Sequence, residues 1–125
     1  MNTIITAKNA PAALGPYSHA VEAGGFLFSS GQIGLDPATG KLAGETTLEQ
    51  AEQVLKNLEA VLAAASMTFA DVVKTTVLLT DLADFAAVNA LYGTRFPADP
   101  PARSCFQAAA LPAGAKIEIE VVAHK

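Results

Sequence analysis

Alternating apolar and polar residues mark the first third of the chain as β-rich. Short runs of this kind occupy residues 3–6, 20–23 and 26–30, and glycine and proline punctuate the sequence between them. Such runs predict strands, because alternate side chains of a strand point to opposite faces of a sheet. The pair Gly24-Gly25 predicts a tight turn between the second strand and the third.

The pattern changes to helical spacing at Thr46. Thr46 and Glu49 have the spacing of a capping box, in which the side chain of each residue satisfies a backbone N–H of the other. The apolar positions that follow are three or four residues apart and predict a helix that ends before Met67: Leu48, Ala51, Leu55, Leu58, Leu62 and Ala65. This narrow stripe of alanine and leucine is typical of a helix that packs on a sheet, not of a cofactor site.

A central strand and a second helix follow. Residues 72–79 are rich in β-branched side chains and apolar at both alternating positions, which is typical of a strand covered on both faces. Asp81 is a suitable N-cap for the next helix, and Pro97 stops it. Three residues line one face of this helix: Phe85, Val88 and Tyr92.

Two strands close the chain, at residues 103–108 and 117–123, with a turn at residues 111–114 between them. After the β-rich start, the elements therefore follow in the order helix, strand, helix and two strands. This order predicts a single α+β domain over residues 1–125. We expect one layer, a mixed sheet with both helices packed on one face.

Composition indicates that the chain does not function as a monomer. Charged residues make up 16% of the 125 residues and hydrophobic residues 51%, so there is too little charge to coat a small monomer. Burial of the excess apolar surface between subunits would account for this composition. Closed symmetric homo-oligomers are the usual arrangement, and we expect one here.

Charge and motif content disfavour several classes of protein. The net charge of −4, without any lysine or arginine cluster, argues against a nucleic-acid partner. No apolar run approaches the ~20 residues of a membrane span, and the first residues lack the pattern of a signal peptide. The single cysteine cannot form an internal disulfide, which suits a cytoplasmic location. His19 and His124 have no partner at metal-ligand spacing, so we expect no metal site.

Arg103 points most directly to a ligand. It follows the rigid pair Pro100-Pro101, and its planar fork matches a carboxylate with two parallel hydrogen bonds. Arginine also stays charged at any physiological pH. A small acidic ligand is therefore expected, and a structural ion pair with a glutamate of the last strand is the alternative.

The alternation of side chains along a strand predicts which residues share a face with Arg103. It places Cys105 and Gln107 on the same face as Arg103, and it places Glu118 and Glu120 together on one face of the last strand. If the two closing strands pair with each other, Glu118 lies beside Arg103. The alternatives are that both glutamates belong to a solvated face and that Cys105 is a small buried apolar residue with no base nearby to lower its pKa.

Six short motifs carry further information through their order and spacing. They are residues 15–18 (GPYS), 29–33 (SSGQI), 73–77 (VKTTV), 84–89 (DFAAVN), 101–105 (PARSC) and 116–120 (KIEIE). Together these motifs closely resemble the RidA/YjgF family, and the match runs over nearly the whole chain. The resemblance implies a chorismate-mutase-like fold, a homotrimer, and ligand sites in the clefts between subunits.

The resemblance also implies an activity, the hydrolysis of reactive enamines and imines to 2-keto acids and ammonia without a metal or cofactor. The implied substrates are small 2-imino and 2-enamino acids, such as 2-aminoacrylate (2-iminopropanoate) and 2-iminobutanoate, and the implied role is the control of metabolite damage. Arg103 would clamp the substrate carboxylate, and Glu118 would position and activate the attacking water.

The other site residues implied by the resemblance bind or enclose the substrate. Backbone groups of Gly31 and Cys105 would hold the imine nitrogen and the carboxylate, with Ser30 alongside. Tyr17 would close the cleft from one subunit over a site built mainly by its neighbour. Asn89 would support the wall of the cleft.

Other functions stay open on the sequence alone. The same clefts would serve a binding or regulatory protein that senses 2-keto acids without turnover, and apolar surface would also suit a chaperone. A ribonuclease or translation inhibitor is disfavoured by the acidic composition. Two departures from the family bear on substrate preference: His19 stands where glutamine is common, and the segment before Arg103 is shorter than in many members.

Overall fold

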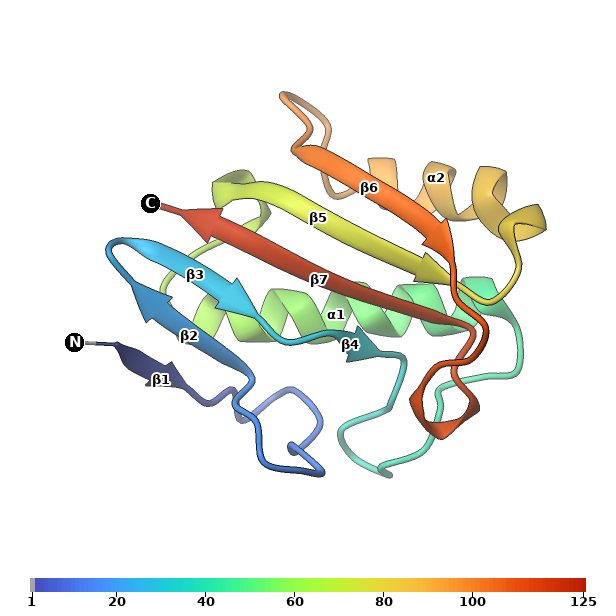
Figure 1. Ribbon diagram of the computed structural model, residues 1–125, viewed down its shortest axis with the longest axis horizontal. Coiled ribbons are helices and arrows are strands. Elements are labelled where there is room, and N and C mark those ends of the chain that lie inside the picture. Colours follow the sequence, from blue (N-terminus) through green and yellow to red (C-terminus); the bar gives the residue numbers. More distant parts are fainter. Residues whose placement is uncertain (1) are drawn as a thin grey trace.

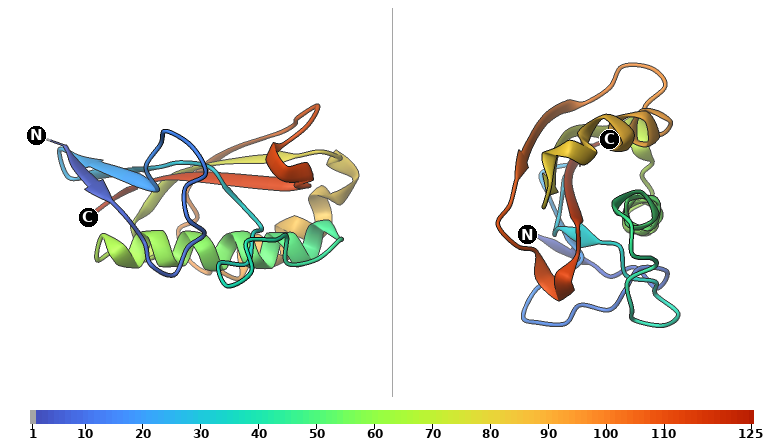
Figure 2. Two further views of the ribbon diagram at one scale, coloured as in Figure 1. Left: turned by 90° about the horizontal axis from the view of Figure 1, so that it is seen from below. Right: turned by 90° about the vertical axis from the view of Figure 1, so that its right-hand side faces the viewer.

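A curved β-sheet with two helices across one face forms the framework of the protein, as the computed structural model of residues 2–125 shows (Figure 1). The helices are α1 (Thr47–Ala64) and α2 (Phe85–Gly93). Figure 2 shows both on the same side of the sheet, so neither covers its other face. The predicted α+β fold, a mixed sheet with both helices on one face, is confirmed.

Within residues 2–125, seven strands form one sheet in the order β1-β2-β3-β7-β5-β6, and β4 also pairs with β7. Only β5 and β6 run parallel, and the other neighbours in this range are antiparallel. The strands are β1 (Thr3–Ile5), β2 (Ala20–Ala23), β3 (Phe26–Ser29), β4 (Gln32–Ile33), β5 (Val72–Leu79), β6 (Ala102–Gln107) and β7 (Ile117–His124).

Hydrogen-bonded capping residues precede both helices. The hydroxyl of Thr46 accepts a hydrogen bond from the Glu49 N–H at 3.1 Å, and the Glu49 carboxylate accepts one from the Thr46 N–H at 3.3 Å, so the predicted capping box is confirmed. Asp81 accepts from the Ala83 N–H at 2.9 Å, but it caps a 3₁₀ turn, Leu82–Asp84, that leads into α2. The predicted cap therefore lies one turn before the α-helix it was expected to start.

The core lies between α1 and the sheet. The apolar stripe of α1 is buried against strand residues that point toward the helix, and the largest fully buried side chains include Leu27, Leu55, Leu58, Leu62, Leu79, Ile117 and Ile119. Burial of a leucine or isoleucine contributes about 1.5–3 kcal/mol to folding, so this layer holds the sheet in its curved shape.

Two buried polar side chains on α1 attach the helix to the loops at one end of the sheet. The amide of Asn57 donates to the carbonyl oxygens of Ile33 at 3.1 Å and Leu35 at 3.0 Å. Gln50 accepts from the N–H of Lys116 at 2.8 Å. These bonds fix the segment after β4 and the start of β7, and the apolar stripe alone gave no sign of them.

The two closing strands do not pair with each other, which corrects the arrangement considered from the sequence. β5 lies between them, parallel to β6 and antiparallel to β7. The connection from β5 to β6 runs through α2, and a helical crossover returns the chain parallel to the strand it left. The other edge of β5 is then free to pair with β7.

Candidate active site

A cavity of about 500 Å³ opens beside β4 and the start of β7. Three segments form it: the loop before β2, the chain between β3 and β4, and the loop before β7. Its walls are mainly apolar, with one carboxylate among them. The lining residues are Pro11, Ala12, Leu14, Tyr17, Ser30, Gly31, Gln32, Ile33, Leu35, Pro112, Ala113 and Glu118.

A bulge between β3 and β4 turns Ser30 and Gly31 into this cavity. Phe28 pairs with Val122 and Gln32 pairs with Ile119. The three residues 29–31 therefore lie opposite the two residues 120–121 of β7. An extra residue in one strand bends it and re-aims the side chains beside it. The sequence motif marks these two residues, but the bulge that presents them depends on the pairing with β7.

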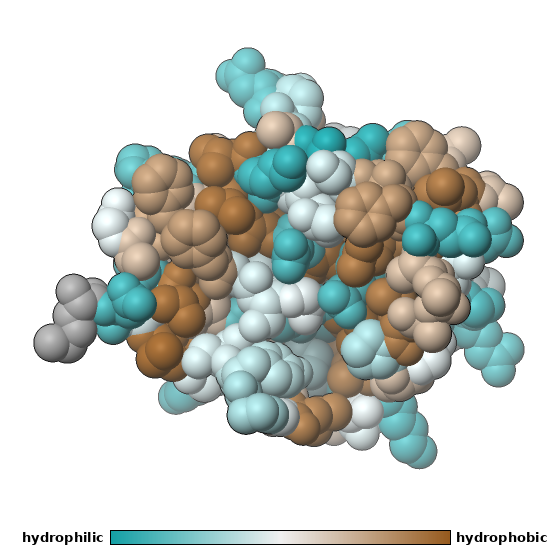
Figure 3. Space-filling view, in the orientation of Figure 1, coloured by the Kyte–Doolittle hydropathy of each residue, from teal (hydrophilic) through white to brown (hydrophobic). Residues whose placement is uncertain are grey.

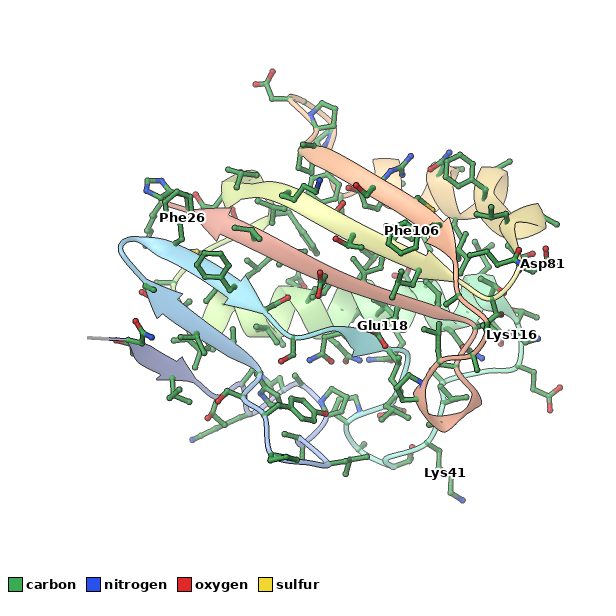
Figure 4. The ribbon with its side chains drawn as sticks, viewed as in Figure 1. Phe26, Lys41, Asp81, Phe106, Lys116 and Glu118 are labelled. Atoms are coloured by element: carbon green, nitrogen blue, oxygen red, sulfur yellow. The ribbon has the colours of Figure 1, made fainter. Side chains whose placement is uncertain are left out.

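Glu118 lies over this bulge, on the sheet face that α1 and α2 leave open (Figure 4). A Cβ atom placed on Gly31 would lie 2.7 Å from Glu118 Cδ, so the carboxyl group rests directly on the glycine. Burial raises the pKa of Glu118 above its ordinary value of 4.5, and the charge on Glu120 raises it further. A partly dry carboxylate of this kind is well suited to accept a proton from water.

Ser30 and Tyr17 are joined through the loop before β2. The Ser30 hydroxyl donates to the Ser18 carbonyl oxygen at 2.6 Å, and the Leu14 N–H donates to the Tyr17 hydroxyl at 3.4 Å. The Tyr17 ring is half exposed at the rim of the cavity. The hydroxyl proton of Ser30 is thus used to hold the loop, and its oxygen remains able to accept.

Arg103 belongs to a second group of residues, between β6 and α2. It donates to Asn89 Oδ1 at 2.7 Å, and its guanidinium carbon lies 4.9 Å from the Tyr92 ring centroid and 5.3 Å from that of Phe85. This is the only hydrogen bond of the guanidinium within residues 2–125, and the ion pair found in that range joins Arg95 to Glu52. Arg103 is therefore held in place with donors to spare, and the alternative of a structural ion pair with Glu118 or Glu120 is not realised in the single chain.

Cys105 lies on the same face of β6 as Arg103 and packs partly buried against the core. Burial raises the pKa of its thiol above the ordinary value, while the charge of Arg103 opposes this shift. The group is therefore a neutral thiol near pH 7, which agrees with its interpretation as a small apolar residue rather than a nucleophile.

The structure divides the predicted site residues into two groups and does not join them within one chain. Arg103 is opposite Thr75, whose buried side chain points toward α2, where its hydroxyl bonds that of Tyr92 at 2.7 Å. Glu118 is opposite Leu78, which points to the other face of the sheet. The prediction that Glu118 lies beside Arg103 is wrong for the single chain, because β5 separates their strands and the sheet separates their side chains.

The open face of the sheet is rich in exposed apolar side chains. Phe28 is 48% exposed and Phe106 52%, with Phe26 and Ile4 also on this face, and Figure 3 shows the apolar patches on both sides of a polar centre. Figure 4 labels Phe26 beside the C-terminal end of β7, the strand that carries Glu118, and Phe106 on β6. An exposed apolar surface of this kind marks an interaction site.

The residues around Arg103 carry a signal in the sequence of α2. Phe85, Asn89 and Tyr92 follow one another at spacings of four and three, which places them on one helix face. The helical spacing predicts Phe85 and Tyr92 on the apolar stripe of this helix. The polar residue between two aromatic ones on that stripe indicated a partner for a charged group, and Arg103 is that partner.

Fold and site together define a small α+β protein with a fixed arginine that keeps free donors and a separate cavity that contains a carboxylate. A family model described as Endoribonuclease L-PSP matches residues 7–125. The chain belongs to this family, and the resemblance to RidA proteins inferred from the motifs is confirmed.

Named relatives are similar over nearly the whole chain. The chain is 52% identical over 120 residues to Reactive Intermediate Deaminase A, chloroplastic, of Arabidopsis thaliana, covering 96% of this chain and 64% of that protein. It is 49% identical to the human 2-iminobutanoate/2-iminopropanoate deaminase, covering 96% of this chain and 88% of that one.

Solved structures are also similar over nearly the whole chain. A putative endoribonuclease L-PSP from Entamoeba histolytica superposes with a TM-score of 0.97 at 46% identity, covering 100% of both chains. Escherichia coli TdcF with bound serine superposes with a TM-score of 0.92 at 40% identity, covering 98% of each chain.

Two further findings concern residues 2–125 as a whole. No helix in this range is long and apolar enough to cross a membrane. No three histidine, cysteine, aspartate or glutamate side chains in the same range are grouped so that they could hold a metal ion.

Proposed function

We propose that the protein is a hydrolase that converts small 2-imino acids, formed from 2-enamino acids such as 2-aminoacrylate, to 2-keto acids and ammonia. The observation that carries this proposal is the state of Arg103, a fixed guanidinium with free donors and no carboxylate partner within residues 2–125. The human and Arabidopsis relatives named as deaminases support the reaction class. 2-Iminopropanoate and 2-iminobutanoate are the substrates we expect.

The proposed reaction needs one base and one anion clamp. Arg103 holds the substrate carboxylate through two parallel hydrogen bonds, which orients the imine carbon toward the water. Glu118 takes a proton from that water as the water oxygen bonds to the carbon of the protonated imine and the C=N electron pair moves to nitrogen, which gives a neutral amine. Glu118 then returns the proton to nitrogen. The C–N bond breaks as the C=O bond forms, and the departing ammonia takes up the hydroxyl proton to become ammonium.

The remaining roles surround these two groups. Backbone groups of Gly31 and Cys105 bind the imine nitrogen and the carboxylate, and Ser30 lies alongside. Tyr17 closes the cleft. Asn89 holds the guanidinium by its 2.7 Å bond and so supports the wall of the site.

The site in this proposal is completed by a second copy of the chain. The Arg103 group and the Glu118 cavity lie on different faces of one sheet, so a working site needs one group from each of two subunits. A contact between two different patches can repeat head-to-tail, and such contacts form a closed ring when the rotation between neighbouring subunits closes. We propose the homotrimer that the resemblance implies, with the open apolar face buried between subunits.

The activity is tested by generating 2-aminoacrylate and 2-iminobutanoate in situ with a PLP-dependent dehydratase and following keto acid release. Wild type should accelerate release, and Arg103→Ala and Glu118→Ala should each lower kcat/KM by about 100-fold or more. An inert wild type that still binds 2-ketobutyrate would replace the proposal by the ligand-sensing alternative. An Arg103→Ala variant with full activity would remove the clamp from the mechanism.

The shared site has a test of its own, in which the two inactive variants are mixed. In oligomers re-formed from equal amounts of Arg103→Ala and Glu118→Ala chains, about a quarter of the sites receive both intact groups, so activity should return to about that fraction. Each variant refolded alone is the control. Mixed oligomers without any activity would show that one chain supplies both groups.

Two further parts of the proposal concern nucleic-acid partners and the location of the protein in the cell. We expect no nucleic-acid partner, since acidic residues outnumber basic ones 12 to 8, and an assay for RNA cleavage by the purified protein tests this. We also propose a cytoplasmic location, which cell fractionation tests.

A further inference from the structure

A buried histidine outside both groups of site residues lies at the base of the loop that forms one wall of the cavity. His19 is 5% exposed. Its Nδ1 accepts a hydrogen bond from the Ala7 N–H at 2.9 Å, and its Nε2 lies 2.7 Å from the Pro11 carbonyl oxygen. Both ring nitrogens are therefore used by the backbone of one loop.

These two contacts define the proton on the ring. The Ala7 N–H can only donate and the Pro11 carbonyl can only accept, so Nδ1 carries no proton and Nε2 carries one. The ring is thus neutral.

The loop held by this ring supplies the outer wall of the candidate active site. Pro11, Leu14 and Tyr17 all line the 500 Å³ cavity. The backbone of His19 reaches the floor of the same cavity as well, because its carbonyl oxygen accepts from the Ser30 N–H at 2.9 Å. Ser30 precedes the glycine on which the Glu118 carboxyl rests. His19 therefore connects the wall of the cavity to its floor.

We propose that His19 is a positioning residue, whose neutral ring fixes the segment from Ala7 to Tyr17 and thereby sets how tightly the site binds its substrate. The inference rests on the proposed function, because the wall meets a substrate only if the cavity is the active site. His19 does not touch the reacting atoms. Its loss should therefore raise KM more than it lowers kcat.

Two substitutions separate this role from simple packing. His19→Leu keeps a buried side chain of similar size and removes both hydrogen bonds, so KM should rise about tenfold while kcat falls less than about threefold. His19→Gln keeps one donor and one acceptor on a planar amide and should return KM to within about threefold of wild type. Val61→Ala, in the core of α1 and outside both site groups, is the control for lost stability and should leave KM unchanged.

The order of the loop can be measured independently of the enzymatic reaction. Hydrogen exchange at the Ala7 amide should be slow in wild type and in His19→Gln, and at least about 100-fold faster in His19→Leu. The chain has two histidines, so the ¹⁵N spectrum of the rings is simple, and His19 should show the signature of a neutral ring protonated at Nε2. The Kd for 2-ketobutyrate supplies a binding measurement that does not depend on catalysis.

The outcomes distinguish this inference from the proposed function. An inert wild type overturns the proposed hydrolase, and the exchange rates and the Kd then decide the role of His19. A His19→Leu variant with a fast-exchanging Ala7 amide and unchanged KM and Kd would overturn the inference, since the loop would be freed without effect on binding. A ring that is charged or protonated at Nδ1 would overturn it too.

Discussion

Replacing Gly31 by alanine tests the catalytic geometry most directly. The backbone of Gly31 lies outside the left-handed region, so alanine fits its conformation without strain. The new Cβ, however, would overlap Oε2 of Glu118 and lie 2.7 Å from Cδ and 2.9 Å from Cγ. Because Cγ is also too close, the whole end of the side chain has to move.

The size of the effect follows from this geometry. Moving Cδ from 2.7 Å to an ordinary contact of 3.4 Å requires a shift of about 0.7 Å. A displacement of about 1 Å in a catalytic group lowers rates by about 100-fold, so we expect kcat/KM of Gly31→Ala to fall by about 10- to 100-fold. Stability should change little, since the atoms in contact belong to the flexible end of the Glu118 side chain, which can move aside.

The assay is keto acid release from imines formed in situ, with thermal unfolding as the check on folding. Gly93→Ala is the matched control, because a Cβ there meets nothing within 4 Å and should leave the rate unchanged. In a Glu118→Gln background, Gly31→Ala should have almost no further effect. Full activity of the Gly31→Ala variant would refute the proposed contact. So would a loss of activity from Gly31→Ala in the Glu118→Gln background as large as the loss in wild type.

Three further predictions concern pH and stability. Proton abstraction needs ionised Glu118, so the rate should fall as pH drops through its raised pKa; Glu120→Gln removes a nearby negative charge and should move this acid limb to lower pH in a pH–kcat profile. Tyr92→Phe leaves the buried Thr75 hydroxyl without its 2.7 Å partner and should lower the free energy of unfolding by about 1–2 kcal/mol in denaturant titrations. Thr46→Ala removes the cap of α1 and should lower the melting temperature through a loss of about 1 kcal/mol, whereas Thr46→Ser should keep it.

The elements of this fold are readable from the sequence because the signals that specify them are local. β5 was predicted with its observed bounds, Val72–Leu79, from its continuous apolar run, and the start of α1 was predicted from the capping box at Thr46. The shared face of Arg103 and Cys105 followed from strand alternation alone. Each of these features depends on residues within a few positions of one another.

What only the tertiary structure decided is how distant segments meet. The crossover through α2 places β5 between β6 and β7, and this separates Arg103 from Glu118 although their strands follow one another in sequence. The buried polar contacts of Asn57 and His19 also join segments whose pairing no periodicity specifies. Strand order and buried hydrogen bonds depend on how the whole chain can bury its apolar surfaces and pair its buried polar groups at the same time. The sequence therefore determined the chemical groups of the site, and the fold decided that one chain holds them apart.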